Sequence, residues 1–240
     1  MNLFDQFDAE LGEQTQAATL TNAAEGKPIK TQEDREREWL QQRWGKFTAS
    51  EVHKLMTYPN KDELPKGAMT YIMKVVAETL TEFHIDTFSS SAMECGKLRE
   101  PEAVDAFQAA TGLDVSKCKD DQEFIDRGHV GGTPDGLILS EFSGIEIKCP
   151  NSNTHINYLH IKTGADLKAE APDYYWQIHC LMMLTASLHW YFVSYDPRFK
   201  SKKHHLHIAK IAADPGDIGA LRRRLALAEA YKQKIIVDLK

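Results

Sequence analysis

Apolar and polar residues follow two kinds of spacing along this chain, and the spacing predicts a mixture of helices and strands. Apolar residues recur at helical spacing over residues 68–84, and a largely apolar stretch over residues 173–188 predicts a buried helix. Residues 189–197 predict a strand that stops at a proline, and residues 206–211 alternate as another. Further helices are expected over residues 31–44, 51–56, 93–112 and 215–234.

The stretch GGTPDGLILSEFSGIEIKCP, residues 131–150, predicts a β-hairpin. Its two short runs, residues 137–139 and 145–148, are separated by a polar turn and bounded by glycine and proline. Glycine and proline at the ends of such runs are typical of paired strands. We therefore expect the two runs to lie side by side in a sheet.

Three side chains that can support metal chemistry converge on this hairpin. Side chains alternate faces along a strand, so Ile145 and Ile147 should face a core while Glu146 and Lys148 share the opposite face. Asp135, at the mouth of the first strand, can reach that face. Two carboxylates suit Mg²⁺, which takes the rest of its shell from water and substrate phosphate, and a lysine can orient or deprotonate a bound water.

This acidic cluster at one edge of a sheet also has a plainer interpretation, in which Glu146 and Lys148 form an ordinary ion pair on a solvated strand. The Pro-Asp-Gly turn at residues 134–136 and the Cys149-Pro150 stop favour a functional site. An exposed hairpin has no need of an acid fixed at the strand mouth. The arrangement resembles the Pro-Asp…(Asp/Glu)-x-Lys nuclease motif.

Length and composition indicate a soluble globular protein. The chain has 240 residues, of which 42% are hydrophobic and 27% charged, and this suits one domain. Residues 1–30 are polar and alanine-rich and are expected to form a flexible arm, with a single domain over residues 31–240. No apolar run is long enough for a membrane span and no secretory signal is recognisable, so we expect a cytoplasmic protein. The scattered cysteines, Cys95, Cys118, Cys149 and Cys180, form no zinc spacing and are expected as free thiols.

The net charge of −6 argues against a surface that coats nucleic acid broadly, although it leaves room for a confined phosphate channel. Basic residues cluster at residues 200–205 and 222–224, and each cluster is as readily a solvated surface as a binding surface. His155 and His160 lack convincing metal spacing and are expected to be ordinary hydrogen-bonded histidines.

A second candidate site lies upstream, where Thr48 and Ser50 precede the expected helix 51–56 at N-cap positions. The amino end of a helix binds anions, and Arg43 could complete a phosphate pocket there, but ordinary helix capping is a far commoner reason for such hydroxyls. Glu100 could face the acidic cluster. Gln177, in an otherwise apolar helix, is either a core amide or a site residue.

Several motifs together resemble the phage lambda exonuclease family, of the alkaline exonuclease or viral recombinase type. They are Arg43 with Gly45 and TASEVH at 48–53, Gly96-Lys97 with Glu100, PDGL at 134–137, EIKCP at 146–150, Gln177, and YDPR at 195–198. Their order matches the family over about residues 37–235. The resemblance implies an α/β restriction-endonuclease-like core, with a mixed central β-sheet flanked by α-helices.

The same resemblance implies a Mg²⁺-dependent, processive 5′→3′ exonuclease. Such an enzyme degrades one strand of linear double-stranded DNA to 5′-mononucleotides and leaves a 3′ overhang for recombination by strand annealing. It implies two Mg²⁺ ions per active site, with Mn²⁺ as a substitute, a homotrimeric ring around the DNA, and a single-strand annealing protein as partner.

Residue by residue, the resemblance implies a metal site and its supporting groups. Asp135, Glu146 and the backbone carbonyl of Ile147 match the metal ligands, and Glu100 matches an acid that assists the second metal, partly through water. Lys148 matches the lysine that activates the attacking water. Gln177 matches a polar group near that water.

The resemblance also implies which residues bind the DNA end. Arg43, Ser50 and Thr133 match the residues that grip the terminal 5′-phosphate, with Thr133 retaining the hydroxyl of a serine in the lambda enzyme. Met93 falls near an apolar wedge that separates the strands, on weaker local similarity.

Two rival functions remain open at this point. A structure-specific or restriction-type endonuclease could use the same core, and would cut closed circular duplex as well as linear duplex. A non-catalytic DNA-end-binding recombination protein would bind DNA without Mg²⁺-dependent turnover. The acids and lysine of the hairpin weigh against the second rival, because a pure binder has no need of two carboxylates beside a phosphate.

Overall fold

The computed structural model describes residues 31–239, except residues 60, 62, 85–90 and 119–120, and it describes only the backbone of residue 32 and of residues 91–97. The chain divides into two units, Met1–Glu36 and Arg37–Lys240. The predicted arm at residues 1–30 lies outside the described residues. Thr31 caps the next helix as expected, since its hydroxyl accepts the backbone N–H of Asp34 at 3.1 Å.

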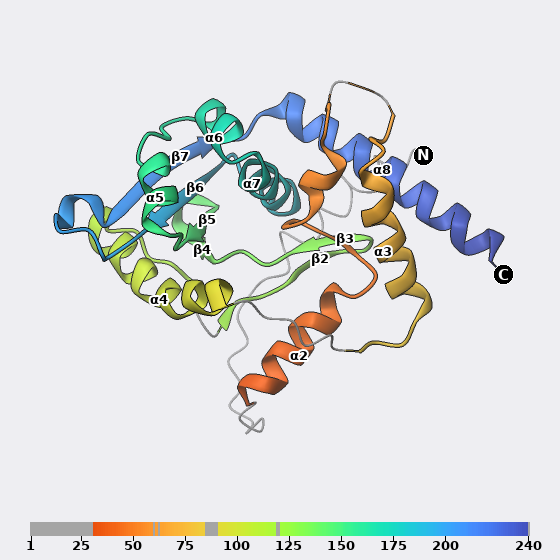
Figure 1. Ribbon diagram of the computed structural model, residues 1–240, viewed down its shortest axis with the longest axis horizontal. Helices are drawn as coiled ribbons and strands as arrows, with labels where there is room; N and C mark the ends of the chain where they lie inside the picture. Colours follow the sequence, from red (N-terminus) through yellow and green to blue (C-terminus); the bar gives the residue numbers. More distant parts are fainter. Residues whose placement is uncertain (1–30, 60, 62, 85–90, 119–120, 240) are drawn as a thin grey trace. The chain divides into compact units, whose positions relative to one another are not determined.

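The strands form two mixed sheets (Figure 1). One sheet has the order β4 (Gly136–Ile138), β5 (Ser143–Lys148), β6 (His189–Tyr195) and β7 (Leu206–Ala212), with β5 and β6 parallel and the other neighbours antiparallel. The other has the order β1 (Phe47–Thr48), β3 (Val130–Gly132) and β2 (Ile125–Arg127), with β1 and β3 parallel. The expected α/β architecture with mixed pairing is confirmed, although the strands divide into two sheets.

The predicted hairpin is present as β4 and β5, joined by a short 3₁₀ turn at Leu139–Glu141. Ile145 and Ile147 join an apolar cluster, as the alternation predicted. One expectation was wrong: β5 does not lie at a sheet edge, because β6 pairs along its other side. Parallel pairing of this kind buries a strand on both faces, and Glu146 is fully buried.

Helices cover both faces of the four-stranded sheet (Figure 1). On one face, Val104 and Phe107 of α4 (Ser91–Thr111) pack with Ile145 and Val193. On the other lies α7 (Pro172–Thr185), which is buried along most of its length and also contacts β3. The remaining helices are α2 (Gln32–Arg43), α3 (Ala68–Leu80), α5 (Ser152–Tyr158), α6 (Gly164–Glu170) and α8 (Pro215–Asp238).

The segment expected to form a helix at residues 51–56 is instead a single 3₁₀ turn, η1 (Val52–Leu55). Thr48 lies in β1, and the residue before the turn is Glu51, whose side chain makes no capping bond. The predicted N-caps at Thr48 and Ser50 are therefore wrong. A four-residue turn also has too few aligned peptide dipoles to attract a phosphate by itself.

The basic cluster at residues 222–224 lies on α8 and is only partly a surface feature. Arg224 is buried, and its Nη2 donates to the carbonyls of Tyr58 and Lys61, at 2.8 Å each. Neither a solvated face nor a phosphate surface describes this residue. It attaches a loop to the helix, because the two N–H groups of one guanidinium nitrogen reach two carbonyls of that loop.

Two other features agree with expectation where they are described. Cys118, Cys149 and Cys180 form no disulfide, and Cys95 falls among the residues with undescribed side chains. Over the described parts of the chain, every helix is too short or too polar to cross a membrane.

Candidate active site

The predicted acids and lysine come together at the carboxyl end of β5. Asp135 precedes β4, and its Oδ2 accepts the backbone N–H of Ile147 at 2.6 Å. Glu146 points from β5 toward α7, where Gln177 Nε2 donates to its Oε1 at 2.6 Å. Lys148 Nζ pairs with the same oxygen. Antiparallel β4 and interior β5 thus fix both carboxylates, and α7 supplies the amide.

Burial dominates the electrostatics of this cluster. It raises the pKa of Glu146 well above the ordinary value, and the neighbouring Asp135 charge raises it further. Burial also raises the pKa of Asp135. For Lys148 burial acts to lower the pKa, but the two carboxylates outweigh it and the net pKa lies above the ordinary value. The ammonium also lies 4.7 Å from the Tyr174 ring centroid.

The donor set of this cluster suits a divalent cation. Glu146 Oε2 is buried and has no hydrogen-bond partner among the described residues, a costly arrangement for a carboxylate oxygen. Within the described residues no group of three or more His, Cys, Asp and Glu side chains could enclose a metal. Mg²⁺ is commonly held by one or two carboxylates plus substrate phosphate, and Asp135 and Glu146 fit that requirement.

Glu100 lies at the border of this cluster. It belongs to α4, and its Oε1 accepts a hydrogen bond from Gln122 Nε2 at 2.6 Å. Its charge contributes to raising the pKa of both Glu146 and Cys149, so it lies within electrostatic reach of the site. Gln122 was not singled out from the sequence, and no motif there marks it.

The three residues matched to the phosphate grip also come together. Arg43 Nη2 donates to Ser50 Oγ at 3.0 Å, and the guanidinium lies 4.3 Å over the ring of Trp39. Trp39 Nε1 donates to Thr133 Oγ1 at 2.9 Å. Trp39 therefore joins Arg43 to Thr133, although sequence reasoning missed its role. The available signal was that Trp39 lies four residues before Arg43, which places the two side chains on one face of the helix.

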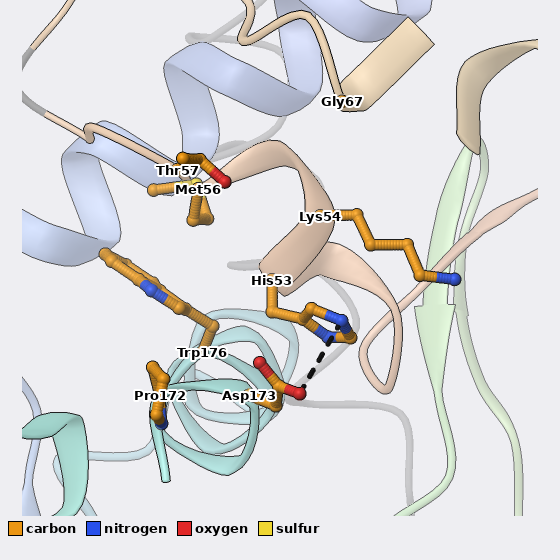
Figure 2. Close-up of a pocket in the computed structure, with 8 residues that line it drawn as sticks. All are labelled: His53, Lys54, Met56, Thr57, Gly67, Pro172, Asp173 and Trp176. Atoms are coloured by element: carbon orange, nitrogen blue, oxygen red, sulfur yellow. Dashed lines mark ion pairs between the residues drawn. The ribbon is translucent and has the colours of Figure 1, made fainter. Parts of the chain in front are cut away.

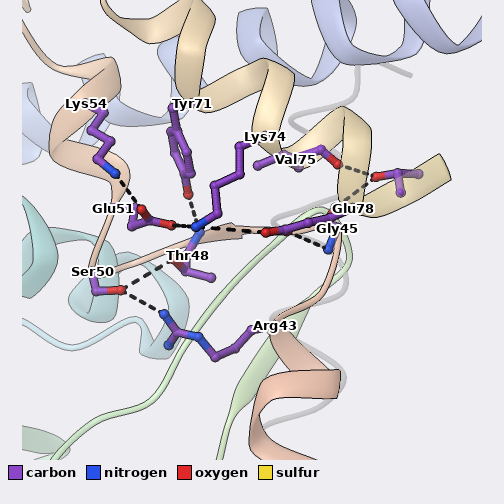
Figure 3. A network of polar contacts seen from close by, with 11 residues as sticks. Arg43, Gly45, Thr48, Ser50, Glu51, Lys54, Tyr71, Lys74, Val75 and Glu78 are labelled. Carbon is purple, nitrogen blue, oxygen red and sulfur yellow. Dashed lines mark hydrogen bonds and ion pairs between the residues drawn. The ribbon is translucent and has the colours of Figure 1, made fainter. Parts of the chain in front are cut away.

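Helix α3 holds the backbone between Arg43 and Ser50 (Figure 3). The N–H of Thr48 donates to the Tyr71 hydroxyl at 2.8 Å, and the N–H of Gly45 donates to Glu78 Oε2 at 3.1 Å. Gly45 has φ +71°, a left-handed conformation that suits glycine. The guanidinium and the hydroxyl are thus set by fixed backbone rather than by a helix end.

An unassigned cavity of about 470 Å³ opens between η1 and the first turn of α7 (Figure 2). His53 and Asp173 face each other across it at 3.8 Å, and Met56 and Trp176 form its apolar wall. None of the predicted site residues lines this cavity. The residues predicted for catalysis therefore lie in the carboxylate cluster and not at this cavity.

Two further predictions concern single residues. His155 is an ordinary hydrogen-bonded histidine, as expected, since its ring nitrogens contact Ser194 Oγ at 2.7 Å and the carbonyl oxygen of His204 at 2.8 Å. Met93 belongs to α4, but the structure describes only its backbone and not its side chain.

Comparison with known proteins gives a match to one family and to several solved structures. A profile of the YqaJ-like viral recombinase domain matches residues 38–187. The solved structure of LHK-Exo in complex with dAMP is similar over 85% of this chain and 95% of that chain, with TM-score 0.70 and 29% identity. The structure described as an alkaline exonuclease (LHK-Exo) from Laribacter hongkongensis covers 84% and 95%, with TM-score 0.69 and 28% identity.

A phage-related exonuclease from Haemophilus somnus shares the fold at 16% identity, with TM-score 0.65 over 81% of this chain and 96% of that chain. No curated protein gives a significant match. The structural neighbours are alkaline exonucleases of the restriction-endonuclease-like fold, which confirms the fold class expected from the motifs.

Proposed function

The chain belongs to the YqaJ-like viral recombinase family, and from this premise we propose that it is a processive 5′→3′ exonuclease of linear double-stranded DNA. It would release 5′-mononucleotides and leave a 3′ overhang for strand annealing. The observation that supports this most strongly is the cluster of Asp135, Glu146 and Lys148 with its orphaned buried carboxylate oxygen. The complex of LHK-Exo with dAMP is in keeping with a mononucleotide product.

In this proposal Asp135, Glu146 and the Ile147 carbonyl would hold Mg²⁺, with Glu100 assisting a second ion. Such metals would supply charge stabilisation to the reacting oxygens of a phosphodiester. The chain's own groups orient the reactants. Gln177 fixes one oxygen of Glu146, which leaves the other for the cation.

Lys148 acts through its charge. The ammonium pairs with Glu146 in the cluster, and in this proposal it donates hydrogen bonds to the water or to the phosphate and stabilises the charge that develops there.

Direction of digestion requires recognition of one DNA end, and Arg43 supports that role. The guanidinium lies over the Trp39 ring and donates to Ser50, and no described residue forms an ion pair with it. Two parallel N–H donors match the free oxygens of a 5′-phosphate. Ser50 and Thr133 add hydroxyls beside it. Each cut generates a new 5′-phosphate, so this pocket would draw the strand forward.

The net charge supports a proposal for the assembly. A net charge of −6 argues against a broad basic surface, and a homotrimeric ring would retain DNA by topology instead. We propose this ring, acting in the cytoplasm with a single-strand annealing protein. Sedimentation of the full chain should show a trimer. A monomer that digests long DNA processively would contradict it.

The function is tested by digesting end-labelled linear duplex with Mg²⁺ and identifying the released label. The expected result is a 5′-mononucleotide from 5′-phosphorylated ends and no cleavage of closed circular duplex. Glu146→Gln serves as the matched inactive control, since it keeps side-chain volume. Cleavage of the circle would indicate the endonuclease rival. Binding without turnover would indicate the non-catalytic rival.

A further inference from the structure

The connection between β6 and β7 carries lysines that are not neutralised by the protein. This basic loop, residues 198–204, includes Lys200, Lys202 and Lys203, all exposed. No described residue forms an ion pair with any of the three. Three such lysines within four residues are notable because the chain as a whole is acidic, with net charge −6.

Several other lysines among the described residues do form ion pairs with acids. Lys46 pairs with Asp126, Lys168 with Asp217 at 2.5 Å, and Lys210 of β7 with Glu141 at 3.3 Å. An acidic chain that leaves three neighbouring ammonium groups unpaired has a surface suited to an anion.

The base of the loop is fixed by a buried carboxylate. Asp196 is fully buried, and both of its oxygens accept hydrogen bonds from the Arg198 guanidinium, at 2.6 and 3.0 Å. Ser152 Oγ donates to Asp196 at 2.6 Å. These contacts hold the pKa of Asp196 well below its ordinary value against the opposing effect of burial, so the carboxylate remains charged.

Two histidine rings fix the two ends of the loop. His205 Nε2 donates to the Phe199 carbonyl at 2.7 Å, and His155 Nε2 donates to the His204 carbonyl at 2.8 Å. A carbonyl only accepts, so Nε2 carries the proton in each ring. Burial lowers the pKa of His155, which favours the neutral ring, with Nδ1 accepting from a serine hydroxyl. The loop is thus held at both ends without using its lysines.

The loop is attached directly beside the candidate active site. Arg198 Nη2 donates to the Pro150 carbonyl at 2.9 Å, two residues after Lys148. Lys148 itself pairs in register with Ser194 near the end of β6, from which the loop departs. The lysines therefore leave the sheet at the same end as the catalytic cluster.

We propose that Lys200, Lys202 and Lys203 bind backbone phosphates of the duplex that flanks the scissile phosphodiester. The inference rests on the proposed nuclease function and adds a DNA-binding surface to it. Lysine binds phosphate as a point charge without sequence preference, as an exonuclease requires. The fixed base reduces the ordering cost on binding.

The test is the salt dependence of duplex binding, measured by fluorescence anisotropy without divalent metal over a series of KCl concentrations. Each lost phosphate contact lowers the slope of log K against log[salt] by about 0.9. Lys202→Ala/Lys203→Ala should therefore lower the slope by about 1.8. The matched control is Lys66→Ala/Lys234→Ala, which removes the same charge from two exposed lysines that also lack a described ion pair.

Lys202→Arg/Lys203→Arg keeps the charge and should restore the slope, which separates electrostatics from folding. An unchanged slope in the alanine variant, or an equal decrease in the control, overturns the inference. Either result can occur while the wild-type chain still degrades DNA, in which case the proposed function stands. Failure of the wild-type chain to cleave DNA overturns the function itself.

Discussion

Replacing Arg43 by alanine gives the sharpest test of how the DNA end is recognised. The substitution removes the guanidinium that stacks on Trp39 and donates to Ser50. A terminal 5′-phosphate differs from a 5′-hydroxyl end by its added charge and free oxygens. Comparing the two ends in one variant therefore isolates the contribution of the pocket from effects on metal binding or chemistry.

The magnitude follows from the contact that is lost. Hydrogen bonds to charged groups contribute about 1.5–3 kcal/mol, which corresponds to roughly ten- to a hundredfold in rate. The variant should fold, because no described carboxylate pairs with Arg43 and none is left unpaired. The Ser50 hydroxyl keeps Thr48 Oγ1 as a neighbour at 3.4 Å. Burial already lowers the pKa of Arg43, so removing the charge relieves a desolvation cost.

The assay compares kcat/KM on matched duplexes with 5′-phosphate and 5′-hydroxyl ends. For Arg43→Ala we expect the preference for phosphate to fall by roughly ten- to a hundredfold, with processivity falling as well. Arg43→Lys should recover part of the charge effect but not the bidentate contact. Arg223→Ala, on the exposed side of α8, removes the same charge and should leave the preference unchanged.

Two results would refute this reasoning. If Arg43→Ala keeps the full preference for 5′-phosphate, the phosphate pocket lies elsewhere. If digestion of both ends decreases equally, Arg43 supports the fold of the segment and does not recognise the phosphate.

Three other substitutions test the remaining parts. Lys148→Ala should retain DNA binding while kcat falls by about 10²–10³, in single-turnover cleavage, and near-normal cleavage would remove the lysine from the mechanism. In metal-free thermal unfolding, the stability of Glu146→Gln relative to wild type should increase as the pH rises from 5 to 8. Burial raises the pKa of Glu146 in the folded protein, so ionisation of this carboxyl opposes folding as the pH rises. A difference independent of pH would show that Glu146 is not perturbed. Gly45→Ala should cost about 1–2 kcal/mol in chemical denaturation, since its φ is positive and its Cβ would lie close to the Thr79 side chain. Unchanged stability would contradict that strain.

The sequence alone determined the local features of the carboxylate cluster. Glycine and proline delimit the hairpin, and a period of two places Glu146 and Lys148 on one face with Ile145 and Ile147 on the other. These patterns depend only on residues that are close together in the sequence, so they can be recognised without the tertiary structure. The long apolar stretch that became α7 was equally clear, because its length excludes a strand.

The phosphate pocket depended on distant pairing. Phe47 and Thr48 pair with Val130 and Gly131, more than eighty residues away along the chain. That pairing draws Thr48 into a strand and leaves η1 as one turn, so the expected N-cap never forms. The link from Trp39 to Thr133 spans a similar separation and has no local signature.

Tertiary structure also decided the state of chemically similar residues. Glu146 is buried because β6 pairs beside β5, and that burial is the largest cause of its raised pKa. The two basic clusters were indistinguishable in sequence, yet Arg224 is enclosed against a loop while Lys202 and Lys203 are exposed. The sequence determines the chemical type of each side chain. Burial and charge pairing depend on neighbours that the fold brings together, and burial and pairing determine how each side chain behaves.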